Sequence, residues 1–111
     1  MDNPKFQINR TANNQFHFVL KARNGEVILK ASETYLTNQG CRNGIEAVKA
    51  NAPFDSRYNR RDAVFNYTFN LEAANGKILG NSERYDSRAA RENGIEAVKR
   101  DAPNAPTEDL S

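Results

Sequence analysis

The sequence predicts an α+β protein: two tandem β-β-β-α repeats form one pseudo-twofold domain, with an antiparallel sheet and two helices on one of its faces. Three observations predict this fold. The heptapeptide NGIEAVK stands at residues 43–49 and again at residues 93–99. A stretch with the two-residue period of a strand precedes each copy, and a proline follows each copy, at Pro53 and Pro103. At 111 residues the chain is long enough for one ordinary core, so we expect the repeats to share it.

The strands are predicted by apolar residues that alternate with polar ones. This period of two is typical of an antiparallel strand with one face in the core and the other in water. In both repeats an Asn-Gly pair follows, and Asn-Gly readily adopts the positive φ values of tight hairpin turns. The alternating apolar residues are Phe16, Phe18, Leu20 and Ala22 in the first repeat, and Phe65, Tyr67, Phe69, Leu71 and Ala73 in the second.

Each hairpin is expected to have a returning strand and a further strand before it. The preceding strands are predicted at residues 5–9 and 57–61, the second with less support because Arg60 stands in place of Ile8. The segments that end in Asn-Gly, residues 15–25 and 66–76, match each other at an offset of 51 positions. The segments after them, ILKASETY (28–35) and ILGNSERY (78–85), match at an offset of 50. The first repeat therefore has one extra residue, which we place near Val27 in a strand bulge or a longer turn.

The helices are predicted from an apolar stripe of helical period. In the first repeat Cys41, Ile45, Val48 and Ala52 lie at positions i, i+4, i+7 and i+11. The second helix should begin after Ser87, which is a favourable N-cap, and carry Ile95, Val98 and Ala102 on its stripe. Proline cannot continue a helix, so Pro53 and Pro103 mark the two ends.

A glycine stands inside each predicted helix, at Gly44 and Gly94. Glycine in a helix costs about 1 kcal/mol relative to alanine, so a compensating contact is needed. We expect each glycine to let its helix approach the sheet, or the other helix, more closely than a side chain would permit.

The repeated pattern of an alternating strand, NG, IL..SE.Y and NGIEAVK.NAP resembles the YegP-like family of small, mostly bacterial proteins of uncharacterised function. The resemblance extends from Phe6 to Pro103. It implies a three-stranded meander and a helix in each repeat, with the two repeats joined as an internal pseudo-dimer, and it implies no activity. The signature residues are Asn24, Gly25, Tyr35 and Gly44 in the first repeat, and Asn75, Gly76, Tyr85 and Gly94 in the second.

The predicted domain comprises residues 1–103, with the first repeat at about 5–53 and the second at about 57–103. Residues 104–111 contain prolines, acidic residues and almost no apolar surface, and we expect them to be disordered.

Composition excludes several classes of protein. The net charge of +2 is too small to indicate a nucleic-acid or membrane partner by itself. Cys41 is the only cysteine, so the chain has no internal disulfide and no cysteine cluster for a metal. The chain has no signal-peptide pattern and no run near the roughly 18 apolar residues that a membrane span needs. We expect a cytoplasmic monomer without a cofactor.

Catalysis is not expected. Ser32-Glu33-x-Tyr35 recurs as Ser82-Glu83-x-Tyr85, and a pseudo-twofold axis could bring the two glutamates together as acid and base of a hydrolase or transferase. We favour a structural role for these strand ends, because no histidine lies near them in the sequence. His17 is expected on the solvent side of a strand, and Cys41 in the core.

The function predicted instead is binding of a protein or a small ligand by the face of the sheet that the helices leave open. A nucleic acid is the alternative partner, provided that folding gathers Lys21, Arg23, Arg57, Arg60 and Arg61 into one basic track. The candidate residues of the partner surface are His17, Lys21, Arg23, Thr68, Asn70 and Glu72.

Overall fold

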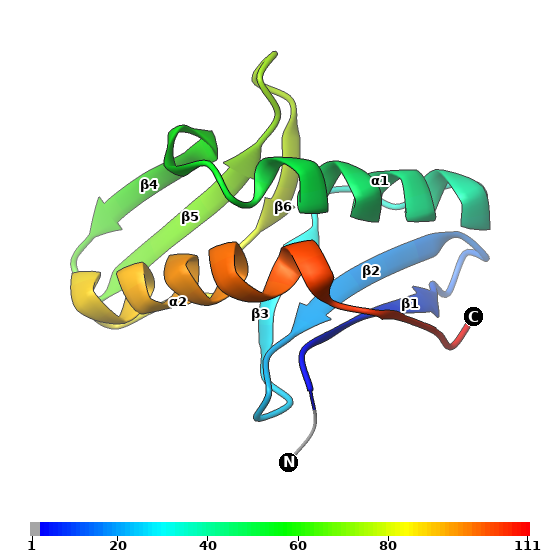
Figure 1. Cartoon of the computed structure of the whole chain (residues 1–111), viewed down its shortest axis with the longest axis horizontal. Helices are drawn as coiled ribbons and strands as arrows, with labels where there is room; N and C mark the ends of the chain where they lie inside the picture. The colour runs from blue at the N-terminus through cyan, green and yellow to red at the C-terminus, as the bar shows by residue number, and fades with distance from the viewer. Residues whose placement is uncertain (1–2) are drawn as a thin grey trace.

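The computed structural model describes residues 3–111, so residues 1 and 2 of the predicted domain lie outside the described residues. One seven-stranded sheet has the strand order β4-β5-β6-β3-β2-β1-β7 (Figure 1). In chain order the elements are β1 (Lys5–Arg10), β2 (Phe16–Lys21), β3 (Val27–Ala31), α1 (Asn38–Asn51), the 3-10 helix η1 (Asp55–Arg57), β4 (Tyr58–Ala63), β5 (Asn66–Glu72), β6 (Ile78–Asn81), α2 (Arg88–Asp101), the 3-10 helix η2 (Ala102–Asn104) and β7 (Thr107–Asp109).

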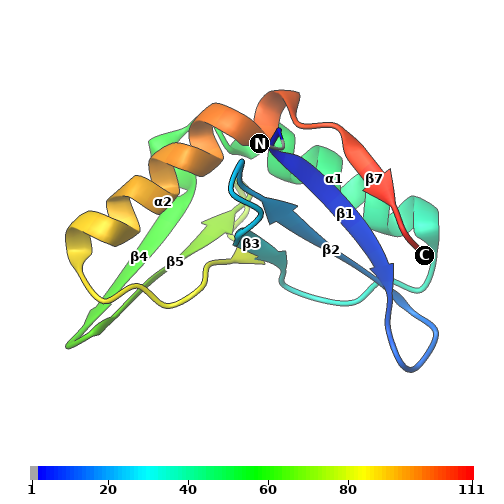
Figure 2. The ribbon, with the colours of Figure 1, turned by 90° about the horizontal axis from the view of Figure 1, so that it is seen from below.

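Both α-helices lie on the same side of the sheet, as Figure 2 shows. The two halves join at the centre of the sheet, where β3 and β6 pair antiparallel with Lys30 opposite Asn81. The predicted fold of two β-β-β-α halves around one sheet is confirmed. Neither helix in residues 3–111 is long and apolar enough to cross a lipid bilayer.

The core lies between the sheet and the helices. On β2 the inward side chains of Phe16, Phe18 and Leu20 are buried, and the residues between them are half-buried on the opposite face. Phe65 does not follow the predicted alternation: it lies in the turn between β4 and β5 with φ of 57° and is 68% exposed. β5 begins only at Asn66, because Val64 and Phe65 form the two-residue turn that joins β4 to β5.

The strand β4 forms although Arg60 replaces an apolar residue. Arg60 lies opposite Phe69, just as Ile8 lies opposite Phe18. Its guanidinium is bound by the carboxylates of Glu92, at 2.9 Å, and Asp55, at 2.8 Å. The paired charge makes the strand compatible with the helix side of the sheet.

The extra residue of the first repeat does not lie near Val27. A bulge is present there, but both repeats contain it, with Ile28 and Leu79 as the buried extra residues. Leu20 pairs with Leu29 and its equivalent Leu71 pairs with Gly80, so the strands remain 51 positions apart through β3 and β6.

The offset changes only after β3. Phe16 forms a bridge with Tyr35, whereas the equivalent Tyr67 forms one with Tyr85. The extra residue therefore lies between Ala31 and Tyr35, in the connection that leads to α1.

Helix α2 begins after Ser87 and both helices end before their prolines, as predicted, and Thr37 is the N-cap of α1. The side chain of Ser87 accepts a hydrogen bond from the backbone of Ala90, and Thr37 does the same for Gly40 at the start of α1. The C-caps are Ala52 and Ala102, each directly before a proline.

The two helical glycines make room for tyrosine rings. A Cβ atom on Gly44 would lie 2.8 Å from Cζ of Tyr35, and one on Gly94 would lie 2.7 Å from Cζ of Tyr85. Each tyrosine also stacks on a core phenylalanine, Tyr85 on Phe69 with 6.5 Å between ring centroids. The packing explanation for the glycines is correct, and the group that approaches is a side chain of the SExY motif.

The C-terminal segment 104–111, for which disorder is predicted, is instead ordered against the sheet. Thr107–Asp109 forms β7, which pairs parallel with β1. The backbone N–H of Phe6 donates to the carbonyl of Pro106, at 2.8 Å. Composition alone did not reveal this strand because its stability comes from the hydrogen bonds and ion pairs that β1 and α1 provide.

Candidate functional site

The candidate site is the open face of the sheet, defined as the side chains of its strands that point away from α1 and α2. Strand alternation and register place amides, a histidine, a threonine and charged groups on it. The open face comprises Lys5, Gln7, Asn9, His17, Val19, Lys21, Val27, Lys30, Asn59, Arg61, Ala63, Asn66, Thr68, Asn70, Glu72, Ile78, Asn81 and Glu108.

One row of this face crosses all seven strands in register. Four of its seven residues are amides, and the only apolar one is Val19. From edge to edge the row is Glu108, Gln7, Val19, Lys30, Asn81, Asn70 and Asn59. Such a row presents donors and acceptors with apolar surface between them, a composition that suits recognition of a polar partner.

Hydrogen bonds between neighbouring strands orient several of these groups. The amide of Gln7 donates to Glu108 at 2.7 Å, and the amide of Asn81 donates to Asn70 at 2.8 Å. Near the opposite edge, Asn59 donates to a carboxylate oxygen of Glu72 at 3.1 Å. These bonds hold the amides in fixed positions. Gln7 is buried, whereas Asn59, Asn70 and Asn81 are at least partly exposed and keep part of their hydrogen-bonding capacity, because each amide has two donors and two acceptor lone pairs.

Two cations on the open face have no ion-pair partner among residues 3–111. They are Lys21 on β2 and Arg61 on β4. Lys30, in contrast, pairs with Glu83 at 3.2 Å. Lys21 and Arg61 are therefore the charges of this face that remain available to a partner.

His17 lies half-buried on the open face, opposite Asn9 of β1. Burial lowers its pKa below the ordinary value of 6.5, and the nearby Lys30 lowers it further. The imidazole is accordingly neutral near pH 7 and provides one donor and one acceptor.

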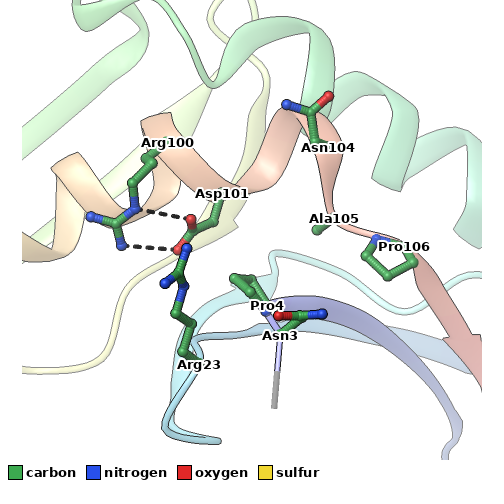
Figure 3. A pocket seen from close by; sticks show the side chains of 8 residues that line it. All are labelled: Asn3, Pro4, Arg23, Arg100, Asp101, Asn104, Ala105 and Pro106. Carbon is green, nitrogen blue, oxygen red and sulfur yellow. Dashed lines mark hydrogen bonds and ion pairs between the residues drawn. The ribbon is translucent and has the colours of Figure 1, made fainter. Parts of the chain in front are cut away.

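Thr68, Asn70 and Glu72 occupy the same face of β5 as predicted, but Arg23 does not lie on the open face. It stands in the turn between β2 and β3, at the border of a hollow of about 260 Å³ that Asn3, Pro4 and the segment 104–106 also line (Figure 3). In this hollow Asp101 accepts two hydrogen bonds from Arg100, both of 3.0 Å. The hairpin turn carries Arg23 beyond the end of β2, so strand alternation no longer decides its direction.

Glu33 and Glu83 do not share a cleft. Glu33 lies with Tyr35 and Lys77 in one cleft of about 350 Å³, and Glu83 lies with Tyr85 in another of about 390 Å³. The two glutamates follow β3 and β6, and these central strands are antiparallel, so they leave the sheet at opposite ends. The acid-base pair that a hydrolase would require is not assembled.

The five basic residues proposed for nucleic-acid binding are not gathered either. Lys21 and Arg61 lie on strands that β3, β6 and β5 separate. Arg60 points to the helix side, where two carboxylates neutralise it. Arg57 donates to the side chain of Asn51 at 2.9 Å, and Arg23 lies in a turn. The continuous basic track that this alternative needs is absent from the described residues.

Cys41 lies in the core, as predicted. Its side chain has no exposed surface, and burial raises the pKa of the thiol to about 11. The thiol is thus protonated near neutral pH and has no access to solvent, which makes it a poor nucleophile.

Arg91, the residue that replaces Cys41 in the second repeat, is buried, although no sequence pattern predicted it. Its side chain is only 2% exposed and binds Asp62, Glu92 at 3.0 Å and the carbonyl of Arg61 at 3.0 Å. Arg60 is a second case in which a charged residue of the second repeat stands where the first repeat has an apolar residue, Ile8. The sequence signal was the pair of arginines at positions where the first repeat has Ile8 and Cys41.

The chain is similar to proteins of several bacteria. It is 47% identical over 78 residues to a UPF0339 protein of Shewanella oneidensis, covering 69% of this chain and 70% of that protein. It is 44% identical over 78 residues to the UPF0339 protein YegP of Escherichia coli K12, covering 69% of this chain and 70% of YegP.

Two solution NMR structures share the fold. The structure of a UPF0339 protein of Shewanella oneidensis matches with a TM-score of 0.88 and 44% identity, over 96% of this chain and 91% of the other. The structure of YegP of Escherichia coli, a protein of unknown function, matches with a TM-score of 0.88 and 37% identity. The match covers 99% of this chain and 95% of YegP.

The sequence signature of one family matches the chain twice, at residues 12–59 and 65–109. Each match begins shortly before the second strand of a half, β2 or β5. It runs through the helix to the strand that follows, β4 in the first match and β7 in the second. The two matches agree with the two repeats of the fold. The chain belongs to the family described as a domain of unknown function (DUF1508), whose relatives named above are UPF0339 proteins.

Proposed function

We propose that this protein is a non-catalytic binding module whose working surface is the open face of the sheet and whose partner is another protein. The observation that carries the proposal is the row of fixed amides that crosses the sheet in register, flanked by the unpaired cations Lys21 and Arg61. A surface that served only to remain in water would not need amides oriented across strands, since water satisfies them in any orientation.

The absence of catalysis is supported by the position of each reactive side chain. Cys41 is buried and protonated. His17 has an asparagine opposite it, and no hydrogen bond joins its ring to a carboxylate in the described residues. The two glutamates of the SExY motifs lie in separate clefts. None of these groups has the partner that general acid-base or nucleophilic catalysis requires.

A protein partner is favoured over a nucleic acid because the exposed charges of the open face are mixed. Acidic side chains at Glu72 and Glu108 stand on the same face as Lys21 and Arg61. Phosphate groups would be repelled by these carboxylates, whereas a protein surface with amides and both signs of charge would complement them.

The experiment is a pull-down from a lysate of a bacterium that encodes the protein, with Lys21→Glu as the test variant and Arg23→Glu as its control. Both variants change a basic residue by the same charge, but only Lys21 lies on the open face. We expect the same proteins with the wild type and with Arg23→Glu, and their loss with Lys21→Glu. Equal capture by both variants would contradict the role of the open face.

An NMR titration tests the nucleic-acid alternative. Single-stranded DNA and RNA are added to the labelled protein at low and high salt. We expect no saturable shifts. Shifts that gather at Lys21, Arg23, Arg57, Arg60 and Arg61 and disappear at high salt would support nucleic-acid binding.

A further inference from the structure

The outer edge of β4 has a counterpart elsewhere in the protein that is already occupied. β4 and β1 are the first strands of the two halves, and each pairs with the next strand in the same register: Tyr58 lies opposite Leu71 as Phe6 lies opposite Leu20. The outer edge of β1 carries β7, whereas β4 is the last strand on its side of the sheet. The chain's own C-terminal segment thus shows how an extended peptide binds to this kind of edge.

The segment on β1 is held by backbone and side-chain contacts. The N–H of Phe6 donates to Pro106, and the N–H of Leu110 donates to the carbonyl of Ile8, both at 2.8 Å. On the open face, Glu108 binds the amide of Gln7 at 2.7 Å and the ammonium of Lys5 at 3.4 Å. An acidic residue therefore secures the added strand to an amide and a cation of the edge strand.

The edge of β4 presents the same kinds of group. Asn59 occupies the position of Gln7, and Arg61 follows two residues later on the same face. The side chain of Arg61 forms no ion pair within residues 3–111. The arrangement differs in one respect: the cation Lys5 lies two residues before Gln7, whereas Arg61 lies two residues after Asn59. An acidic residue that faced Asn59 from an added strand would meet the amide, one N–H of which already binds Glu72, and would reach the cation of Arg61 further along β4.

The backbone of β4 has hydrogen-bonding groups for such a strand. Arg61 lies opposite Thr68 and pairs with β5, so by strand alternation the N–H and C=O groups of Arg60 and Asp62 face outward. The N–H of Tyr58 donates to Asp55 within the preceding turn, so the available groups begin at Arg60. The edge then runs to an exposed apolar turn, where Val64 is 81% exposed.

We propose that the free edge of β4 binds an extended acidic peptide segment of another protein as an additional parallel strand. Main-chain hydrogen bonds would provide the affinity, and the contact of a carboxylate with Asn59 and Arg61 would provide the selectivity. The charged residues of β4 disfavour pairing with apolar strands, which limits the partners to segments of complementary charge. Asn59 and Arg61 also belong to the open face, but this proposal concerns backbone pairing along the edge of β4, and amide shifts at Arg60 and Asp62 distinguish it from binding to the open face.

The test uses a synthetic peptide with the sequence of residues 104–111, because this segment is known to bind the equivalent edge. The peptide is titrated into the isotope-labelled full chain, and backbone amide shifts are recorded. A matched peptide has glutamine and asparagine in place of Glu108 and Asp109. We expect saturable shifts at Arg60 and Asp62 with the acidic peptide and about fivefold weaker binding of the amide peptide, the size of effect expected for an exposed ion pair.

Variants of the protein locate the binding. Arg61→Glu should weaken the acidic peptide about tenfold, because it replaces an attraction by a repulsion. The control Arg23→Glu, which reverses an unpaired cation in the turn after β2, should leave its affinity unchanged. Both residues are at the surface and without ion pairs, so neither change should affect folding, which the amide spectrum verifies.

Three results would overturn the proposal. Shifts restricted to Phe6 and Ile8 would mean that the peptide only displaces β7. Shifts restricted to Val19 and Asn70 would mean that it binds the open face. Spectra that do not change at a large excess of peptide would mean that the edge of β4 does not accept an acidic strand.

Discussion

The side chain of Leu29 fills the space in front of Gly80, the residue that holds the same position in the second repeat. Leu29 lies opposite Leu20, and Gly80 lies opposite the equivalent Leu71. A Cβ atom on Gly80 would be 2.8 Å from Cγ of Leu29 and 3.0 Å from the carbonyl oxygen of Lys30. One large residue therefore occupies the space at the centre of the sheet that two symmetric side chains could not share.

A first prediction concerns this contact. Gly80→Ala should destabilise the protein by about 1–3 kcal/mol, because the fully buried Leu29 cannot move away without repacking the core. In a Leu29→Ala background the cost of the same change should fall by about 1 kcal/mol or more. Urea unfolding of the four proteins measures both costs. Equal costs in the two backgrounds would show that Leu29 is not the cause.

The helical glycines lead to a second prediction. Gly94→Ala gains about 1 kcal/mol of helix propensity but forces the ring of Tyr85 away from the helix. We expect a net loss of stability in the wild type and, in a Tyr85→Ala background, a net gain of about 1 kcal/mol. Thermal or urea unfolding shows whether Gly94→Ala lowers or raises the stability in each background.

Asn93→Ala is the matched control for the helix. It lies next to Gly94 but is exposed, so its effect should be the same with and without Tyr85. If Gly94→Ala behaved like this control, the tyrosine would not explain the glycine.

A third prediction concerns acid pH. Hydrogen bonds from Arg60 and then Lys99 lower the pKa of Asp55 from 3.8 to about 2. A carboxyl group whose pKa is lowered by folding contributes stability above its unfolded pKa and loses it as the pH falls toward the folded value. The contribution of Asp55 should therefore be complete above about pH 4–5 and disappear toward about pH 2.

Urea unfolding at a series of pH values measures this effect. Asp55→Asn should lower the unfolding midpoint at neutral pH and reduce its decline in acid, whereas Asp55→Glu should keep most of the decline. Other carboxylates with lowered pKa, such as Glu92 and Asp62, will retain part of the pH dependence. A variant Asp55→Asn with the wild-type profile would disprove the assignment.

The fourth prediction tests the C-terminal strand. A chain that ends at Ala105 loses the pairing of β7 with β1, including the bonds of Phe6 to Pro106 and of Leu110 to Ile8, and the contacts of Asp109 with Asn38 and Arg42. We expect the unfolding free energy to fall by about 1–3 kcal/mol and the amide of Phe6 to exchange faster with solvent. A chain that ends at Leu110 keeps β7 and these backbone bonds and serves as the control. If the amide of Phe6 exchanged equally fast in both chains, the segment would not be ordered as described.

Local pattern determined the elements of this fold. The alternation in Phe16, Phe18 and Leu20, the Asn-Gly turns and the apolar stripe through Ile45 and Val48 each depend on residues that are neighbours along one strand, turn or helix. The repetition of these patterns then determined that two halves share one sheet, because neither half could bury its apolar face alone. The open face also followed from alternation, with the exception of Arg23.

Tertiary structure alone decided the features that depend on contacts between distant segments. Matching letters aligned Ile28 and Leu29 with Ile78 and Leu79, but hydrogen bonds to β2 and β5 fix the register, and they align Leu29 with Gly80. The burial of Arg91 depends on carboxylates of β4 and α2, and the order of β7 depends on β1 and α1. Each of these outcomes is stabilised by groups remote in sequence, and no periodicity within a single segment records them.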